Sequence, residues 1–455
     1  MQISNLAKNR CIALVILCIM LLGTGYIIGE LLRPIHYETD MYDVEYNEIK
    51  SHNTNVDMVF IGSSRILKTF DPRVFEKKMQ LTKVFNLGMN QQTLDGNYFQ
   101  LKEFIEKFHP KTVVIGITYS GLTSNNTHNI VKLRTIHRLH GFNLMAYIKD
   151  CLSIKDYPDI LSIYSFRGNI AKIRKNIKDK QQLQNEGIYI KTKNWHYMGQ
   201  GFTVIPISVP PGNMGIIKQP NFNEEMINNH TLYYLDKCIQ LCKENNINLV
   251  LMTPPASLSY IYSVNNFQDV INYIDDYAHK NNIIYHNLNY LKGREELLTD
   301  PMMHDYKHTN NKGAAVVSEK YAEILSKSLK NIDTSEYFYP TLSEMQKDVK
   351  RIVAVDAKPV IKNNTMTLSI QSLQNKDVIP SYQVLMAKDR NKFNPVINWT
   401  SEKNVSFAVP KKGSAYRILL RARRNETDTD YAWMAWDIDK KGKVNKIKNS
   451  PIAVR

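Results

Sequence analysis

Cysteine is scarce in this chain, with five among 455 residues. Cys11 and Cys18 lie in an apolar N-terminal run, Cys238 and Cys242 are four residues apart in a helical pattern, and Cys151 stands alone. This arrangement excludes a disulfide framework. No cluster of cysteine and histidine has the spacing of zinc ligands, so we predict neither a structural metal nor a cofactor.

The chain also lacks the composition of a disordered or fibrous protein, because 43% of its residues are hydrophobic and 22% are charged. Its length exceeds what one hydrophobic core usually supports, which predicts two folded domains plus an anchor. A net charge of +16 suggests a polyanionic neighbour, such as an anionic membrane surface or a wall polymer. The basic residues are scattered, which disfavours a nucleic acid partner.

Residues 11–29 contain no charge and are about as long as the roughly 20 residues that cross a membrane as a helix. Lys8 and Arg10 precede this run, so the positive-inside rule places the N-terminus in the cytoplasm and the rest of the chain outside. A cleaved signal peptide is the rival interpretation. The run is followed by no A-x-A cleavage site and contains no lipobox cysteine, so we interpret residues 1–34 as a cytoplasmic tip and a transmembrane anchor.

A linker over 35–54 is followed by short apolar runs that alternate with longer amphipathic segments, and this pattern predicts an α/β domain around a parallel sheet over 55–331. "VDMVFIG", "KVFNLGM", "KTVVIGITY", "INLVLMTPP" and "NIIYHNL" are the expected strands. Within about 133–226 the pattern weakens into a basic helical stretch and then a loop. We interpret this stretch as an insertion that could cover a site.

A second linker over 332–355 leads to a different pattern over 356–455, where short alternating segments such as "MTLSIQSL" and "AYRILLRARR" are typical of an antiparallel β-sandwich. Its aromatic residues resemble those of a triple-tyrosine β-sandwich module found on some bacterial surface proteins. Those residues are Tyr382, Trp399, Tyr416 and Tyr431. Aromatic side chains at strand spacing serve in a core more often than in a binding platform.

Ser63 and Ser64 follow a buried strand and a glycine, at the strand end where open parallel sheets hold their sites. A serine hydroxyl there is a nucleophile only if a base lies within hydrogen-bond reach. Far downstream, Asp305 precedes His308 by three residues. That spacing lets a carboxylate orient an imidazole, so these residues are candidates for a serine, histidine and aspartate triad.

The motifs "IGSSR", "FNLGMN" and "DYKH" resemble the blocks of the SGNH/GDSL hydrolase superfamily over residues 55–331. The resemblance implies a flavodoxin-like three-layer αβα domain with a parallel sheet. It also implies that Ser64 is the nucleophile, His308 the base and Asp305 the residue that orients the base. "GSSR" and "HTNNKG" are most similar to the membrane-anchored branch, which includes polysaccharide O-acetyltransferases and the teichoic-acid D-alanylation protein.

The same resemblance implies an oxyanion hole formed by the backbone N–H groups of Ser64 and Gly88. The family's Gly-x-Asn-Asp block is missing, so either Thr118, Tyr119 or Ser120 supplies the third donor or the hole has only two donors. Arg65 could hold an anionic substrate group, although an arginine at a helix start is more often solvated or ion-paired.

The leading hypothesis is an O-acyltransferase on the outer side of a bacterial cell membrane, single-pass, that moves an acyl group, most simply acetyl, onto a surface or secreted glycan. A membrane-bound O-acyltransferase partner would supply the acyl group, because acyl-coenzyme A is absent outside. Three alternatives remain open. They are D-alanyl transfer to teichoic acid, a carbohydrate esterase or deacetylase, and a non-catalytic polymer-binding assembly protein.

Overall fold

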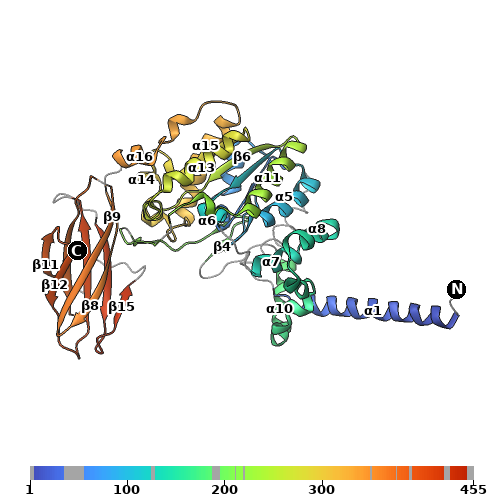
Figure 1. Ribbon diagram of the computed structural model, residues 1–455, viewed down its shortest axis with the longest axis horizontal. Helices are drawn as coiled ribbons and strands as arrows, with labels where there is room; N and C mark the ends of the chain where they lie inside the picture. The colour runs from blue at the N-terminus through green and yellow to red at the C-terminus, as the bar shows by residue number, and fades with distance from the viewer. Residues whose placement is uncertain are drawn as a thin grey trace.

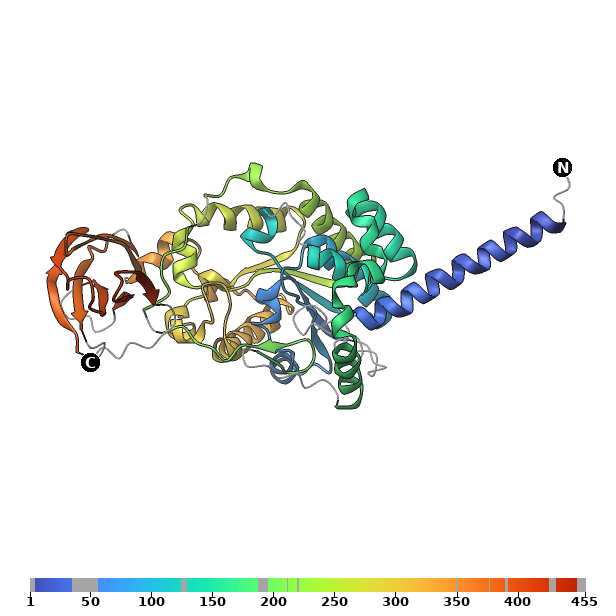
Figure 2. The same cartoon turned by 90° about the horizontal axis from the view of Figure 1, so that it is seen from below.

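The computed structural model describes residues 5–34, 56–123, 129–186, 195–210, 212–218, 221–348, 351–375, 377–388, 392–424 and 431–447. A long N-terminal helix projects from one side of an α/β domain, and a β-structure lies at the opposite end (Figures 1 and 2). The predicted linker over 35–54 lies outside the described residues.

The centre of the α/β domain is a five-stranded sheet in which every pair of neighbouring strands is parallel. The strand order is β2-β1-β3-β6-β7, and the strands are β1 (Met58–Ile61), β2 (Val84–Asn86), β3 (Thr112–Gly116), β6 (Asn248–Thr253) and β7 (Ile284–Asn287). The expected parallel α/β fold is confirmed.

Alternation along the strands divides the sheet residues between two hydrophobic cores. Val59 and Ile61 pack in one core with helices α5, α11 and α13, whereas Met58 and Phe60 pack in the other with α4 and α15. Helices therefore cover both faces, as a buried parallel sheet requires. The helices of the domain are α3 (Ser64–Leu67), α4 (Pro72–Met79), α5 (Leu94–Phe108), α6 (Tyr119–Thr123), α11 (Asn229–Glu244), α12 (Leu258–Ser263), α13 (Phe267–Lys280), α14 (Arg294–Leu297), α15 (Asn311–Ser328) and α16 (Leu342–Asp348).

The chain between α6 and α11 forms a group of helices and then a small hairpin. The helical part comprises α7 (Asn129–Ile136), α8 (Gly141–Cys151), the 3₁₀ helix η1 (Ile154–Ile160), α9 (Ser162–Ser165), the 3₁₀ helix η2 (Arg167–Lys172) and α10 (Ile173–Glu186). The hairpin comprises β4 (His196–Tyr197) and β5 (Thr203–Val204). The helical part lies on the side of the domain from which α1 leaves (Figures 1 and 2).

The C-terminal region consists of two antiparallel sheets that share one hydrophobic core, which agrees with the expected sandwich. Its strands are β8 (Ile352–Lys362), β9 (Thr365–Gln374), β10 (Ser381–Ala387), β11 (Asn394–Thr400), β12 (Asn404–Ala408), β13 (Tyr416–Arg423), β14 (Ala432–Ile438) and β15 (Val444–Ile447). Tyr382 and Tyr416 are buried in this core, whereas Tyr431 stacks on Trp399 with ring centroids 5.8 Å apart.

The N-terminal helix α1 (Asn5–Leu32) contains a span, Asn9–Leu32, that is long and apolar enough to cross a membrane. Its most apolar stretch of 18 residues has a mean hydropathy of 2.7 and no buried residue. Its C-terminal end is built into the fold. A Cβ on Gly29 would lie 2.6 Å from the Ile163 nitrogen, so α9 packs directly on the α1 backbone there. Asn176 of α10 donates a hydrogen bond of 2.8 Å to the Leu32 carbonyl.

Replacing Gly29 by leucine is expected to separate α1 from α9, because the larger side chain would overlap the backbone of α9. Amide hydrogen exchange over residues 162–176 should then become about ten-fold faster or more in the detergent-solubilised full chain. Gly23→Leu is the matched control, since no atom lies within 4 Å of a Cβ at that position. Equal exchange in the two variants would show that the close contact at Gly29 does not hold α9.

Candidate active site

The strand β1 ends at Ile61, and the chain turns at Gly62 into the short helix α3. Gly62 has a φ of +150°, and a Cβ there would lie 2.6 Å from the Ile66 side chain, so a larger residue would disturb this turn. Ser63 caps α3, and Ser64 is its first residue. The turn therefore presents the Ser64 hydroxyl at the carboxyl edge of the parallel sheet.

His308 meets Ser64 from a loop that lies 244 residues further along the chain. Ser64 Oγ and His308 Nε2 are 2.8 Å apart, and His308 Nδ1 lies 2.8 Å from Asp305 Oδ2 and 3.0 Å from Oδ1. The carboxylate also accepts hydrogen bonds from the backbone N–H groups of Lys307 and His308. Because Asp305 accepts a hydrogen bond from Nδ1–H, Nε2 is left to accept the proton of the Ser64 hydroxyl.

Burial, more than the charges around it, keeps His308 neutral near pH 7. Burial lowers the pKa of His308, hydrogen bonding to Asp305 partly offsets this, and the charges of Lys68 and Arg65 lower it further. Burial alone would raise the pKa of Asp305, but hydrogen bonds from the His308 side chain and from the backbone of Lys307 and His308 hold it well below its ordinary value. The pair is therefore a carboxylate next to a neutral imidazole that can take a proton.

A cavity of about 380 Å³ opens beside Ser64 and His308 and contains two cationic side chains, Arg65 and Lys307. Arg65 is buried, donates a hydrogen bond to the Pro254 carbonyl and lies over the Tyr260 ring. Burial lowers its pKa to about 10, so it remains charged at neutral pH.

The Lys307 ammonium lies 5.2 Å from the centre of the Tyr260 ring and 5.4 Å from that of Tyr306. Burial and the nearby Arg65 charge lower the pKa of Lys307. Among the described residues that line the cavity there is no carboxylate. The cavity therefore favours a ligand group with negative charge.

The structure corrects the prediction for Gly88. Its N–H already donates a hydrogen bond of 2.9 Å to Asn86 Oδ1, and a Cβ on Gly88 would lie 2.5 Å from the Leu67 nitrogen. Gly88 is thus packed against α3 and is not among the residues that line the cavity. An oxyanion in the cavity would have to find its second donor elsewhere.

Thr118 and Ser120 line the cavity, whereas Tyr119 packs in the core against Phe222. Thr118 Oγ1 accepts a hydrogen bond of 3.0 Å from the Gly121 N–H and lies 3.5 Å from Ser120 Oγ, so its own proton can go to Ser120 or to a ligand. No described residue accepts a hydrogen bond from the Ser64 N–H. Ser64 and Thr118 therefore remain candidates for the oxyanion hole.

Asn97 is a candidate donor that sequence reasoning missed. It lies in the first turn of α5, is 2% exposed and lines the cavity. Its side-chain Oδ1, which can only accept, has no hydrogen-bond partner, and no described residue accepts a hydrogen bond from its Nδ2, the atom that could donate to a ligand. A buried amide without a full set of partners is costly unless a ligand or water supplies one. The signal in the sequence was an asparagine just after Gly96 at a helix start that follows β2.

One group of metal-type ligands is found among the described residues, namely Asp95, Cys151 and His230, whose ligand atoms lie within 4.8 Å of one another. Cys151 Sγ contacts the Tyr234 hydroxyl at 3.1 Å. Burial raises the pKa of the Cys151 thiol to about 12, so the thiol holds its proton at neutral pH and is a weak metal ligand in that form.

No protein-family model matches the sequence, and no curated protein matches it. Solved structures with a similar fold include a GDSL-like lipase from Bacteroides thetaiotaomicron, with 13% identity over 63% of this chain and 98% of that chain and a TM-score of 0.31. Another is a two-domain esterase active on acetylated mannans, with 10% identity over 88% of this chain and 96% of that chain and a TM-score of 0.25. The chain is thus similar to GDSL-like lipases and acetylesterases at low identity.

Proposed function

We propose that this chain is a serine acyltransferase in which Ser64 is the nucleophile, His308 the general base and Asp305 the residue that holds His308. The hydrogen-bonded chain from Ser64 through His308 to Asp305 carries this proposal. A non-catalytic binding protein would not need this arrangement. A Ser64 hydroxyl too far from His308 to form a hydrogen bond would have favoured a non-catalytic role.

In the first half-reaction, Ser64 Oγ attacks the carbonyl carbon of an acyl donor while His308 Nε2 takes the serine proton. The bond to the leaving group then breaks, and His308 returns the proton to that group. An acyl-serine ester remains. In the second half-reaction, His308 deprotonates an acceptor hydroxyl that attacks the ester, and the proton returns to Ser64.

Donors at the helix start would stabilise the negative charge that develops on the carbonyl oxygen. The Ser64 N–H, the Thr118 hydroxyl and the Asn97 amide are the groups proposed for this role, because all three residues line the cavity. The Ser64 N–H also belongs to the first turn of α3, where backbone N–H groups have no partner within the helix.

The acceptor proposed for the acyl group, an acetyl group in the simplest case, is a glycan hydroxyl on the outer side of a bacterial cell membrane. The apolar α1 supports anchoring in that membrane. Its contacts with α9 and α10 favour a helix that stays in the mature protein over a cleaved signal peptide. Since acyl-coenzyme A is absent outside the cell, we infer that a membrane-bound O-acyltransferase passes the acyl group to Ser64.

A second candidate is transfer of D-alanine to teichoic acid, and the cationic cavity is the observation that favours it. Arg65 and Lys307 would pair with a polyol phosphate as well as with the carboxylate of an acidic glycan. A carbohydrate esterase would use the same triad with water as the acceptor.

The test of the proposed reaction is covalent trapping with p-nitrophenyl acetate. The detergent-solubilised full chain should gain the mass of one acetyl group, and peptide mapping should place it on Ser64. Adding a soluble glycan should shift the product from free acetate to acetylated glycan. Acetate alone would favour the esterase, and a protein that forms no adduct and releases no acetate would contradict a catalytic role.

Replacing Lys307 by methionine is expected to raise KM for an anionic acceptor about ten-fold or more, because a charge-assisted hydrogen bond contributes about 1.5–3 kcal/mol. Hydrolysis of the neutral p-nitrophenyl acetate should change little. Lys312→Met is the control, since Lys312 lies exposed on α15. Equal losses on both substrates would show that Lys307 supports the loop rather than binding charge.

A further inference from the structure

Exposed apolar side chains gather in one part of the chain outside α1. Twelve large hydrophobic side chains beyond α1 are exposed among the described residues, and seven of them lie in 142–170. They are Phe142, Met145, Ile154, Tyr157, Leu161, Tyr164 and Ile170. Single exposed apolar residues are normal, but a concentration of them indicates a surface that something covers.

The contacts of α1 with residues 160–163 indicate at what depth along the proposed transmembrane helix the segment 142–170 lies. A Cβ on Gly25 would be 3.9 Å from the Ile163 side chain, and Gly29 touches the backbone of α9. Leu21 and Leu22 line a cavity together with Ile160 and Leu161. A helix rises 1.5 Å per residue, so Leu21 lies about 12 Å below Gly29 along α1. If α1 crosses the membrane, the segment around Leu161 therefore reaches into the outer leaflet.

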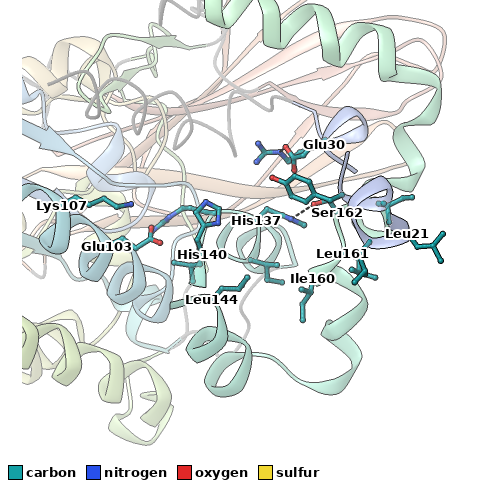
Figure 3. A pocket seen from close by; sticks show the side chains of 18 residues that line it. Leu21, Glu30, Glu103, Lys107, His137, His140, Leu144, Ile160, Leu161 and Ser162 are labelled. Carbon is teal, nitrogen blue, oxygen red and sulfur yellow. Dashed lines mark hydrogen bonds and ion pairs between the residues drawn. The ribbon is translucent and has the colours of Figure 1, made fainter. Parts of the chain in front are cut away.

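The cavity, of about 480 Å³, changes character from one end to the other (Figure 3). Leu21 and Leu161 form its apolar end, beside α1, whereas Glu103 and Lys107 lie at the opposite end. His137 lies between them and shares a hydrogen bond of 3.2 Å with Ser162. Such a passage from hydrocarbon side chains to charged ones matches the boundary between acyl chains and headgroups.

Basic residues occupy the level just above the apolar ones. Glu30, the first charge after the apolar run, pairs with Arg33 at 3.2 Å and with Lys180 of α10 at 3.8 Å. The helix α10 also carries Arg174 and Lys178, which are exposed. Basic side chains at this height attract the phosphates of anionic lipids.

We propose that the helical segment 141–172 rests on the outer surface of the membrane. Its exposed apolar side chains enter the acyl boundary, and the basic residues of α10 meet the lipid phosphates. The occupant of this surface is therefore the bilayer itself. The proposal depends on the membrane anchoring proposed for α1. Two attachments, α1 and this surface, would hold the cavity beside Ser64 at a constant height and orientation above the membrane.

Depth-dependent quenching of tryptophan fluorescence tests the proposal. The full chain is reconstituted in vesicles of equal amounts of phosphatidylglycerol and phosphatidylcholine, with or without brominated phosphatidylcholine. Phe142→Trp and Ile154→Trp place reporters on side chains that are 93% and 83% exposed. The matched control is Ile379→Trp, 79% exposed in the C-terminal region. Ile16→Trp, in the middle of α1, reports on anchoring.

After subtraction of the wild-type signal, Phe142→Trp and Ile154→Trp should be quenched about two-fold or more, and Ile379→Trp should not be quenched. Quenching of Ile16→Trp without quenching of Phe142→Trp and Ile154→Trp would overturn the docking surface and leave the anchor intact. Absence of quenching in Ile16→Trp would overturn the anchor, and the docking proposal with it.

Discussion

Replacing Ser64 by alanine is expected to lower the rate of the proposed acyl transfer by a factor of about 10⁴ or more. The Ser64 hydroxyl is the group that His308 Nε2 meets, at 2.8 Å, and its loss removes the atom on which the acyl group would rest. Mass spectrometry of the intact protein after incubation with p-nitrophenyl acetate should show no acetyl adduct, and release of p-nitrophenol should fall to the background rate.

Ser63→Ala is the matched control because Ser63 lines the same cavity, and its side chain makes no capping hydrogen bond to α3. The rate in this variant should stay within about five-fold of the wild type. A substitution that removes no hydrogen bond and leaves no cavity in the core usually changes the free energy of unfolding little. If Ser63→Ala removed the adduct and Ser64→Ala kept it, the nucleophile would be the neighbouring serine and the assignment here would be wrong.

Replacing Asp305 by asparagine is expected to lower kcat on the order of 10³- to 10⁴-fold. An asparagine that keeps the hydrogen bonds from the Lys307 and His308 backbone would turn its oxygen toward them, so the imidazole would lose its charged partner and its fixed tautomer. The adduct at Ser64 should still form, but slowly, and this separates Asp305→Asn from Ser64→Ala.

The pH dependence of Asp305→Asn gives a second readout. The base acts in its neutral form, so activity is present above the pKa of His308 and is lost as the pH falls through it. Asp305 raises the pKa of His308, partly against burial. Removing the carboxylate should therefore move the acidic limb of the residual activity to lower pH. Asp333→Asn is the control, because this exposed carboxylate also accepts hydrogen bonds from a backbone N–H and a hydroxyl group. It should change neither kcat nor the pH profile of activity.

The triad candidates could be selected from the sequence because each of them belongs to a short motif with a recognisable spacing. Ser64 follows a buried strand and a glycine, and Asp305 and His308 are three residues apart before a helix. A parallel sheet brings the carboxyl ends of its strands to one edge, so the two motifs could be expected to meet there.

The candidate oxyanion donors could not be selected in the same way. Gly88 matched a family motif, but its N–H is taken by Asn86, a partner two residues away whose side chain also reaches the Ile66 and Phe70 carbonyls. Asn97 matched no motif and yet lies in the cavity. Whether a particular N–H or amide is free depends on side-chain contacts that a motif does not describe.

The amino-acid sequence alone determined the parallel sheet, the antiparallel C-terminal region and the apolar helix α1, because hydrophobic periodicity and the length of an apolar run are local properties. Only the tertiary structure decided that Arg65 and Lys307 share one cavity with Ser64, and that α9 packs against Gly29. These contacts join residues that are more than a hundred positions apart, and their geometry follows from how the helices cover the sheet, which no local pattern specifies.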